Sequence, residues 1–392
     1  MTDSITSSTT DSTRPPIPSA LLAQLPRSYA MADLVAQREA MRARGIDVLD
    51  VSIGELHLAP DPQTREALAR AAAEVPFNRY GELRGGRELR AAFAELYHRR
   101  YGIELDPDRE VLALLGSKEG IVNLARAFAD REHPVYCGRV VYPVYRAAAV
   151  QAGAELVHLD GEWQDGYRPS FAGPARRGGV AFVSSPSNPT GAVLGRADLE
   201  RFAAQCRERD AVLCFDAAYA ELSGRQAPIL AIPTVGTQGV VELHSMSKSL
   251  SLAGWRVGFA VGDAELIDGL ARVKSVCDSG VPTPQQHALR HLLPICDPIL
   301  DRTRQQIAGL QQVMRAELAG LGKDLFETDA GLFCWLRPGR PGVEVARACL
   351  DEGVVLVPGA VFGPGGADYV RLSATLPAER MAELAARLRR VL

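Results

Sequence analysis

Short apolar runs alternate with amphipathic helical patterns through the middle of the chain. The seven runs lie between about residue 111 and residue 262, and they read VLALLG, HPVYCG, AELVHLD, GVAFVSSP, AVLCFD, VVELHS and RVGFAVG. Between them, apolar residues recur at helical spacing at Ile121, Leu124, Ala125 and Phe128 and again at Leu199, Phe202, Ala203 and Cys206. This alternation predicts an α/β fold in which helices cover both faces of a mostly parallel, seven-stranded sheet.

The pattern changes after about residue 290. A long helical pattern is followed by the strand-like runs LFCWLRP, GVVLVPG and DYVRLSA and by a helix with Met381, Leu384, Leu388 and Val391 on one stripe. This order of helical and strand-like segments predicts a smaller α+β domain. The helical segment MADLVAQREAMRARG near the N-terminus has no partner close in sequence, so we assign it to the same domain. The predicted organisation is a disordered tail over 1–17, a small domain from 18–50 and 291–392, and a large domain over 51–290.

Composition narrows the choice of partners. The chain has 392 residues, a hydrophobic fraction of 47% and a formal net charge of −3 with both signs scattered. It therefore lacks the basic stripe that nucleic acid or an anionic membrane surface requires. No apolar run approaches the ~18 residues of a membrane-spanning helix, and the Ser/Thr-rich N-terminus lacks the apolar core of a signal peptide.

Cysteines and histidines suggest no metal site. The seven cysteines are widely spaced without a C-x-x-C pair, and the seven histidines do not cluster. Reduced thiols in the cytoplasm are the expected state. His244, beside a lysine-containing motif, is interpreted as a strand residue rather than an acid or base.

Polar residues follow several of the apolar runs, where ligands of open α/β sheets bind. VLALL is followed by GSKEG, in which Gly116, Ser117 and Lys118 begin a helix and could hold a phosphate. Ordinary helix capping would use the same residue types.

Two further runs end in polar groups. GVAFVSSP leads to Asn188 in SNPTG, whose amide can face a site or belong to a simple turn. AVLCF leads to Asp216 and then Tyr219. A buried acid needs a cation or hydrogen-bond donors, so Asp216 belongs either to a site or to a structural ion pair.

The segment SMSKSLSLAGWRVG, residues 245–258, contains one of the four lysines of the chain. Lys248 can lose its proton and condense with a carbonyl, which arginine cannot do. Ser245, Ser247 and Arg256 could hold a phosphate beside it. Together with the preceding groups, this segment predicts a site for a phosphorylated aldehyde.

SMSKSLSLAGWRVG resembles the lysine motif of the class I/II aminotransferases, pyridoxal-phosphate enzymes of the aspartate aminotransferase superfamily. GSKEG, YPVY, NPTG, DAAY and VRLS are similar to further landmarks of that family and occur in the right order. The resemblance covers about residues 30 to 392. It implies the fold of the fold type I pyridoxal-phosphate transferases, with a large and a small domain.

The resemblance also implies roles for individual residues. Lys248 would form a Schiff base with pyridoxal 5′-phosphate, and Asp216 would keep the pyridine nitrogen protonated. Tyr219 and Asn188 would bind the phenolic oxygen. Tyr142 would stack on the ring. The implied phosphate ligands are Ser117, Lys118, Ser245 and Arg256, with Ser247 beside them. Tyr80, in NRYGELRGG, resembles a tyrosine that reaches the phosphate from a neighbouring subunit, which implies a homodimer.

Substrate contacts follow from the same resemblance. Arg371 in DYVRLS would bind the substrate α-carboxylate, with the backbone of Gly54 beside it and Asn188 nearby. SIGELHL departs from the commoner G-x-P-D pattern, so Glu55 and His57 are further candidates for facing the substrate. A second departure, Ala217 after the aspartate, is not expected to affect the cofactor.

The implied reaction is transfer of an amino group between an α-amino acid and a 2-oxo acid. Lyase, cyclase, synthase or oxidase chemistry on the same scaffold is the alternative, because the cofactor performs the difficult step and the pocket directs it. A cofactor-sensing transcription regulator is disfavoured, because only some 50 residues precede SIGEL.

Overall fold

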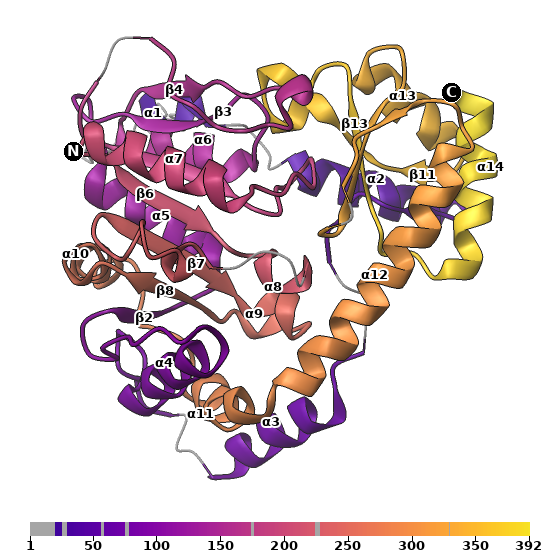
Figure 1. Cartoon of the computed structure of the whole chain (residues 1–392). Helices are drawn as coiled ribbons and strands as arrows, with labels where there is room; N and C mark the ends of the chain where they lie inside the picture. Colours follow the sequence, from indigo (N-terminus) through magenta and orange to yellow (C-terminus); the bar gives the residue numbers. More distant parts are fainter. Residues whose placement is uncertain are drawn as a thin grey trace, which may run out of the picture.

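The computed structural model describes residues 20–25, 30–55, 59–74, 78–173, 176–223, 228–328 and 330–392 (Figure 1). The predicted tail over 1–17 and the candidate His57 lie outside these ranges. Within them, no helix is both long and apolar enough to cross a membrane.

A seven-stranded sheet forms the centre of the larger part of the molecule. Its strand order is β2-β8-β7-β6-β5-β3-β4. The strands are β2 (Val111–Leu114), β3 (Val135–Gly138), β4 (Leu156–Leu159), β5 (Val180–Ser184), β6 (Val212–Asp216), β7 (Val240–Ser245) and β8 (Gly258–Gly262). Neighbouring strands from β4 to β7 are parallel, whereas β8 runs antiparallel to both β2 and β7. The predicted mostly parallel sheet of seven strands is confirmed.

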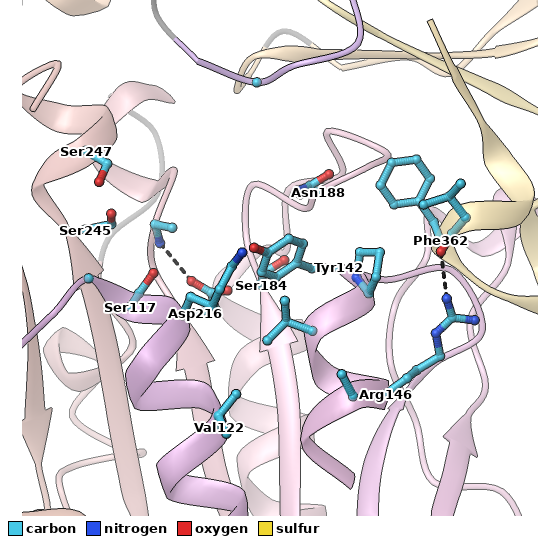
Figure 2. A pocket seen from close by; sticks show the side chains of 18 of the residues that line it. Ser117, Val122, Tyr142, Arg146, Ser184, Asn188, Asp216, Ser245, Ser247 and Phe362 are labelled. Carbon is cyan, nitrogen blue, oxygen red and sulfur yellow. Dashed lines mark hydrogen bonds between the residues drawn. The ribbon is translucent and has the colours of Figure 1, made fainter. Parts of the chain in front are cut away.

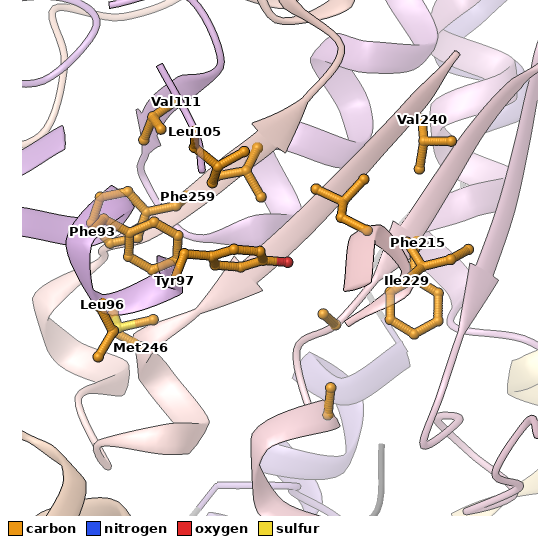
Figure 3. Packing of buried hydrophobic residues seen from close by; sticks show 14 of the residues in the cluster. Phe93, Leu96, Tyr97, Leu105, Val111, Phe215, Ile229, Val240, Met246 and Phe259 are labelled. Atoms are coloured by element: carbon orange, nitrogen blue, oxygen red, sulfur yellow. The ribbon is translucent and has the colours of Figure 1, made fainter. Parts of the chain in front are cut away.

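Helices cover both faces of this sheet, as the apolar spacing predicts. They include α4 (Arg87–Tyr101), α5 (Ser117–Phe128), α6 (Pro143–Ala152), α7 (Arg196–Glu208) and α10 (Ala264–Lys274). One buried cluster joins α5, α6 and α10 to the sheet, and another joins α4 and α7 to it. Figure 3 shows the second cluster, where the rings of Phe93 and Phe259 stack with their centroids 4.0 Å apart. Close packing of this kind fixes the strand ends that carry the polar residues.

The C-terminal third forms a second, smaller sheet. Its order is β12-β13-β10-β9, from β9 (Asp324–Leu325), β10 (Phe333–Arg337), β12 (Val357–Pro358) and β13 (Val370–Ser373), all antiparallel. A separate parallel pair joins β1 (Leu49–Asp50) to β11 (Val354–Val355). Leu49 and Val51 therefore share a buried cluster with the C-terminal residues Met314 and Leu388. The predicted domain boundaries stay a prediction.

The remaining helices connect these parts. They are α1 (Ala20–Gln24), α2 (Ala30–Ala43), α3 (Pro62–Glu74), α8 (Ala220–Ser223), α9 (Met246–Ser249), α11 (Thr283–Leu292), α12 (Asp297–Ala319), α13 (Gly342–Asp351) and α14 (Met381–Val391). The long α12 runs from the region of α3 and α11 to the smaller sheet (Figure 1). In α14, Met381, Leu384 and Leu388 are buried on one stripe, as predicted, and the fourth predicted residue, Val391, is half-buried against the same cluster.

Candidate active site

A cavity of about 1140 Å³ lies at the carboxyl ends of the parallel strands, bordered by residues of both sheets (Figure 2). The predicted site residues that line it are Gly54, Ser117, Lys118, Tyr142, Asn188, Asp216, Tyr219, Ser245, Ser247, Lys248, Arg256 and Arg371, and Gly116 and Glu55 line it as well. Of the predicted residues that the structure describes, Tyr80 is the exception. Its side chain is 90% exposed and does not line the cavity.

Lys248 lies in the short helix α9, directly after β7. The half-buried side chain donates a hydrogen bond from Nζ to the carbonyl of Gly54, and Nζ lies 6.0 Å from the centre of the Tyr219 ring. Burial lowers the pKa of the ammonium to about 8, with Arg371 and Arg256 contributing and Glu55 opposing. Lys248 therefore loses its proton more readily than an ordinary lysine, as a nucleophile or base requires.

Asp216 ends β6 and is only 5% exposed. Its carboxylate accepts hydrogen bonds from the Tyr145 hydroxyl at 2.7 Å and from the backbone N–H of Ala218 at 3.2 Å. Burial raises the pKa of the Asp216 carboxyl, and the bond from Tyr145 opposes that rise. Burial also raises the pKa of Tyr145 well above its usual value, so its hydroxyl stays protonated and donates. A cation placed in the cavity beside Asp216 would stabilise the ionised carboxylate.

The cavity has a cationic end built by α5 and the segment after β7. Gly116 precedes α5 with a φ of +83°, and a Cβ atom there would come within 2.6 Å of the Arg256 guanidinium. Arg256 donates to the carbonyls of Leu115 and Ala253, each at 3.0 Å. The helix N-terminus, the arginine and the hydroxyls of Ser117 and Ser245 form an arrangement suited to a phosphate group.

Arg371, on β13, enters the cavity from the smaller sheet and is 3% exposed. Nη1 donates to Asn188 Oδ1 at 2.8 Å, and Nη2 donates to the carbonyl of Ser52. Phe333 and Phe362 lie against the guanidinium, with ring centres 4.3 and 4.8 Å from Cζ. A guanidinium confined in this way keeps a fixed direction, and its planar donors suit a carboxylate.

Some residues of the site were not identified from the sequence. Ser184, Phe333, Phe362 and Arg146 line the cavity, and Arg146 Nη2 donates to the Val361 carbonyl at 2.6 Å (Figure 2). Tyr145 belongs to the YPVY motif, so the motif was recognised while the contact with Asp216 was not. The interpretation of His244 as a strand residue is confirmed, because it lies in β7 with Nε2 3.2 Å from Glu242.

The family model for aminotransferases of class I and II matches residues 46–388. The chain belongs to this family. The aminotransferase is 31% identical to an LL-diaminopimelate aminotransferase of Aquifex aeolicus, over 92% of this chain and 96% of that protein. It is 34% identical to the LL-diaminopimelate aminotransferase of Syntrophobacter fumaroxidans, over 93% and 96% of the two chains.

Solved structures agree with this membership. Aspartate aminotransferase from Thermus thermophilus with maleate has a TM-score of 0.89 and 25% identity, covering 96% of this chain and all of that one. A probable N-succinyldiaminopimelate aminotransferase from the same species has a TM-score of 0.82 and 30% identity, over 93% and 100%. The aminotransferase is thus an enzyme that moves an amino group between an α-amino acid and a 2-oxo acid.

Proposed function

We propose that this aminotransferase uses pyridoxal 5′-phosphate and that Lys248 is the residue bonded to it. When bound, this cofactor supplies an aldehyde that condenses with amines and a ring that stabilises negative charge at the Cα atom of the amino acid. The observation that carries the proposal is that one cavity combines a half-buried lysine, whose pKa is lowered to about 8, with the buried carboxylate of Asp216. Such a combination is typical of a site that holds a reactive amine beside a cationic ring.

The charges of the cavity fit this cofactor. The start of α5, the hydroxyls of Ser245 and Ser247 and the Arg256 guanidinium suit its phosphate. Asp216 suits a protonated ring nitrogen. Its carboxylate accepts hydrogen bonds from Tyr145 and from the Ala218 N–H, and a cationic ring nitrogen would stabilise its charge further. Tyr142, which lines the cavity, offers an aromatic face for stacking.

The residues divide the work on the substrate. Arg371 binds the α-carboxylate through two parallel donors, which fixes the direction of the Cα–H bond. Lys248, as a neutral amine, removes the proton from that Cα atom. Asn188, which bonds Arg371, and Tyr219, near Lys248, would orient the ring through its phenolic oxygen.

The lysine assignment is tested by absorbance and by chemical trapping. The purified protein should absorb near ~420 nm, and a productive amino acid should shift this band to about 330 nm. Borohydride reduction followed by peptide mapping then identifies the bonded lysine. A reduced adduct on Lys118 or Lys274 would contradict the assignment of Lys248.

The amino donor is an α-amino acid held by Arg371. Because relatives carry the names LL-diaminopimelate and N-succinyldiaminopimelate aminotransferase, these two compounds belong in the first panel, beside aspartate and alanine. The half-reaction rate of each amino acid with the same protein sample ranks them. The panel also includes an amine without an α-carboxylate, and a faster half-reaction with that amine than with any of the amino acids would contradict the role of Arg371.

We further propose a homodimer in which Tyr80 completes the partner's phosphate site. Tyrosine is enriched at protein–protein interfaces, and the 90% exposure of the Tyr80 side chain leaves it accessible to a second copy. Light scattering should give twice the mass of the chain, and Tyr80→Ala should weaken cofactor binding about tenfold, the loss of one hydrogen bond to a charged group. A monomer with full cofactor affinity would contradict this.

The seven free cysteines support a reducing, cytoplasmic location.

A further inference from the structure

A second buried lysine lies outside the cavity, at the C-terminal end of α10. The side chain of Lys274 is 0% exposed, and it does not line the cavity. Its Nζ lies 2.7 and 2.9 Å from the two carboxylate oxygens of Asp278 and 3.2 Å from Oε2 of Glu119. We refer to Lys274, Glu119 and Asp278 as the α10 ion cluster.

Glu119 connects this cluster to the cationic end of the cavity. It lies in the first turn of α5, and the oxygen that faces Lys274 also accepts the backbone N–H of Leu115 at 3.0 Å. The carbonyl of Leu115 accepts Nη2 of Arg256 at 3.0 Å. Both polar backbone groups of Leu115 are therefore engaged, one by the α10 ion cluster and one by Arg256. The next residues, Gly116 and Ser117, form the start of α5 on the cavity wall.

A carboxylate so close to a proposed phosphate site is unexpected on electrostatic grounds. Glu119 carries a negative charge at a helix start that faces an anion, and the side chain is only 16% exposed. Its position is explained if the carboxylate serves as an anchor for the turn. Asn123 donates to its Oε1 at 2.6 Å, and Lys274 holds Oε2 while offsetting the charge. Lysine suits this position, because a compact ammonium fits among three oxygens at zero exposure, where a planar guanidinium is larger.

We propose that Lys274 is a positioning residue for the cofactor phosphate. By orienting Glu119, it holds the Leu115–Gly116 turn, and through this turn it sets the Arg256 guanidinium and the first N–H groups of α5. This inference rests on the proposed use of pyridoxal phosphate. Lys274 touches neither cofactor nor substrate, so it acts on cofactor affinity and leaves the chemical step unchanged.

Glu119→Ala is the deciding variant. If Glu119 acted only through its charge, removing it would tighten phosphate binding. If Glu119 holds the turn, its removal should raise the dissociation constant of pyridoxal phosphate about tenfold, equivalent to about 1.4 kcal/mol. The constant is measured by dialysis of the holoenzyme against graded cofactor concentrations. Wild-type or tighter binding by Glu119→Ala would overturn the proposal.

Lys274→Met should weaken cofactor binding in the same direction, and Lys274→Arg, which keeps the charge, should lie between it and wild type. At saturating cofactor, kcat should stay within about twofold of wild type in all three variants, which a general loss of structure would not allow. If Lys274→Met does not fold, Glu119→Ala and Lys274→Arg still decide the question.

Arg387→Met is the matched control. Arg387 is a half-buried cation of α14 that pairs with the Asp47 and Glu383 carboxylates, and it does not line the cavity. It should lower stability and leave cofactor affinity unchanged. An equal loss of affinity in Arg387→Met would overturn the specific role of Lys274. Repeating the comparison with inorganic phosphate, by its protection against thermal unfolding, tests the turn even if pyridoxal phosphate is not the cofactor.

Discussion

Lys248 and Lys274 are two lysines withdrawn from solvent in the same part of the molecule, and their surroundings have opposite character. Lys274 is fully buried among three carboxylate oxygens. Lys248 is half-buried and bonds a backbone carbonyl, and its pKa is lowered first by burial and then by Arg371 and Arg256, with Glu55 as the opposing carboxylate. A buried cation paired with carboxylates keeps its proton and leaves uncompensated charges if it is removed, whereas a lysine whose pKa is lowered mainly by burial loses its proton more readily.

Separate substitution of each lysine should give the largest difference between the two sites. Lys248→Ala should lower the half-reaction rate about a thousandfold or more, because both the nucleophile and the base are removed. Lys274→Arg should keep the wild-type rate once cofactor is saturating. Single-turnover absorbance with both variants measures the difference. An active Lys248→Ala with its cofactor trapped on another lysine would end the comparison.

The same contrast can be drawn between the two carboxylates, Asp216 and Glu119. Asp216→Ala should stay folded and retain cofactor through the phosphate, yet lose about a hundredfold to a thousandfold in rate, because it no longer stabilises the charged ring. Glu119→Ala should do the reverse and change affinity more than rate. A fast, cofactor-loaded Asp216→Ala would make Asp216 a structural residue.

Arg371 sharpens the comparison from the substrate side. Arg371→Ala should lower kcat/KM about a hundredfold, because a charge-assisted bidentate contact in a buried site is lost. Arg371→Lys should recover only part, since an ammonium cannot present two parallel donors. Cofactor dissociation constants should hardly change, because the residues proposed to hold the phosphate, Arg256 and the start of α5, do not include Arg371. Near-equal kcat/KM values in the three proteins would remove Arg371 from the site.

The smallest expected effect is on stability, and it has opposite signs at the two lysines. Because the pKa of Lys248 is lowered to about 8, charging it in the cofactor-free native state is unfavourable. Lys248→Met should therefore stabilise the cofactor-free protein by about 1–2 kcal/mol below pH 8. Lys274→Met should instead destabilise it, because two carboxylates lose their cation.

The pH dependence of the free energy of unfolding tests the predicted sign at Lys248 a second time. Between pH 8 and the ordinary lysine pKa, the unfolded chain binds the proton that native Lys248 has released, so wild type gains stability as pH rises. The advantage of Lys248→Met should accordingly shrink from pH 8 upward. Urea unfolding at pH 7 and pH 10 measures it, and an advantage independent of pH would point to packing instead.

The sequence was informative where one segment carries its own chemistry. The seven strands were predicted from apolar runs, and the site residues that follow them converge because parallel strands end at one edge. The antiparallel position of β8 between β2 and β7 was not predicted, since strand order depends on pairing between distant segments. Three further features were not predicted for the same reason. They are the hydrogen bond from Tyr145 to Asp216, the phenylalanines beside Arg371 and the α10 ion cluster. Each depends on contacts that no local pattern encodes.

The two ends of the cavity also differ in when they can form during synthesis of the chain. Ser245 and Gly258 pair directly between β7 and β8, so the segment carrying Lys248 and Arg256 is a loop closed by its own neighbouring strands. Arg371, in contrast, bonds Ser52, which lies 319 positions away. Long-range contacts form more slowly than local ones. We therefore expect the proposed phosphate site to form in a nascent chain before the proposed carboxylate site. A C-terminal truncation should abolish the carboxylate site first.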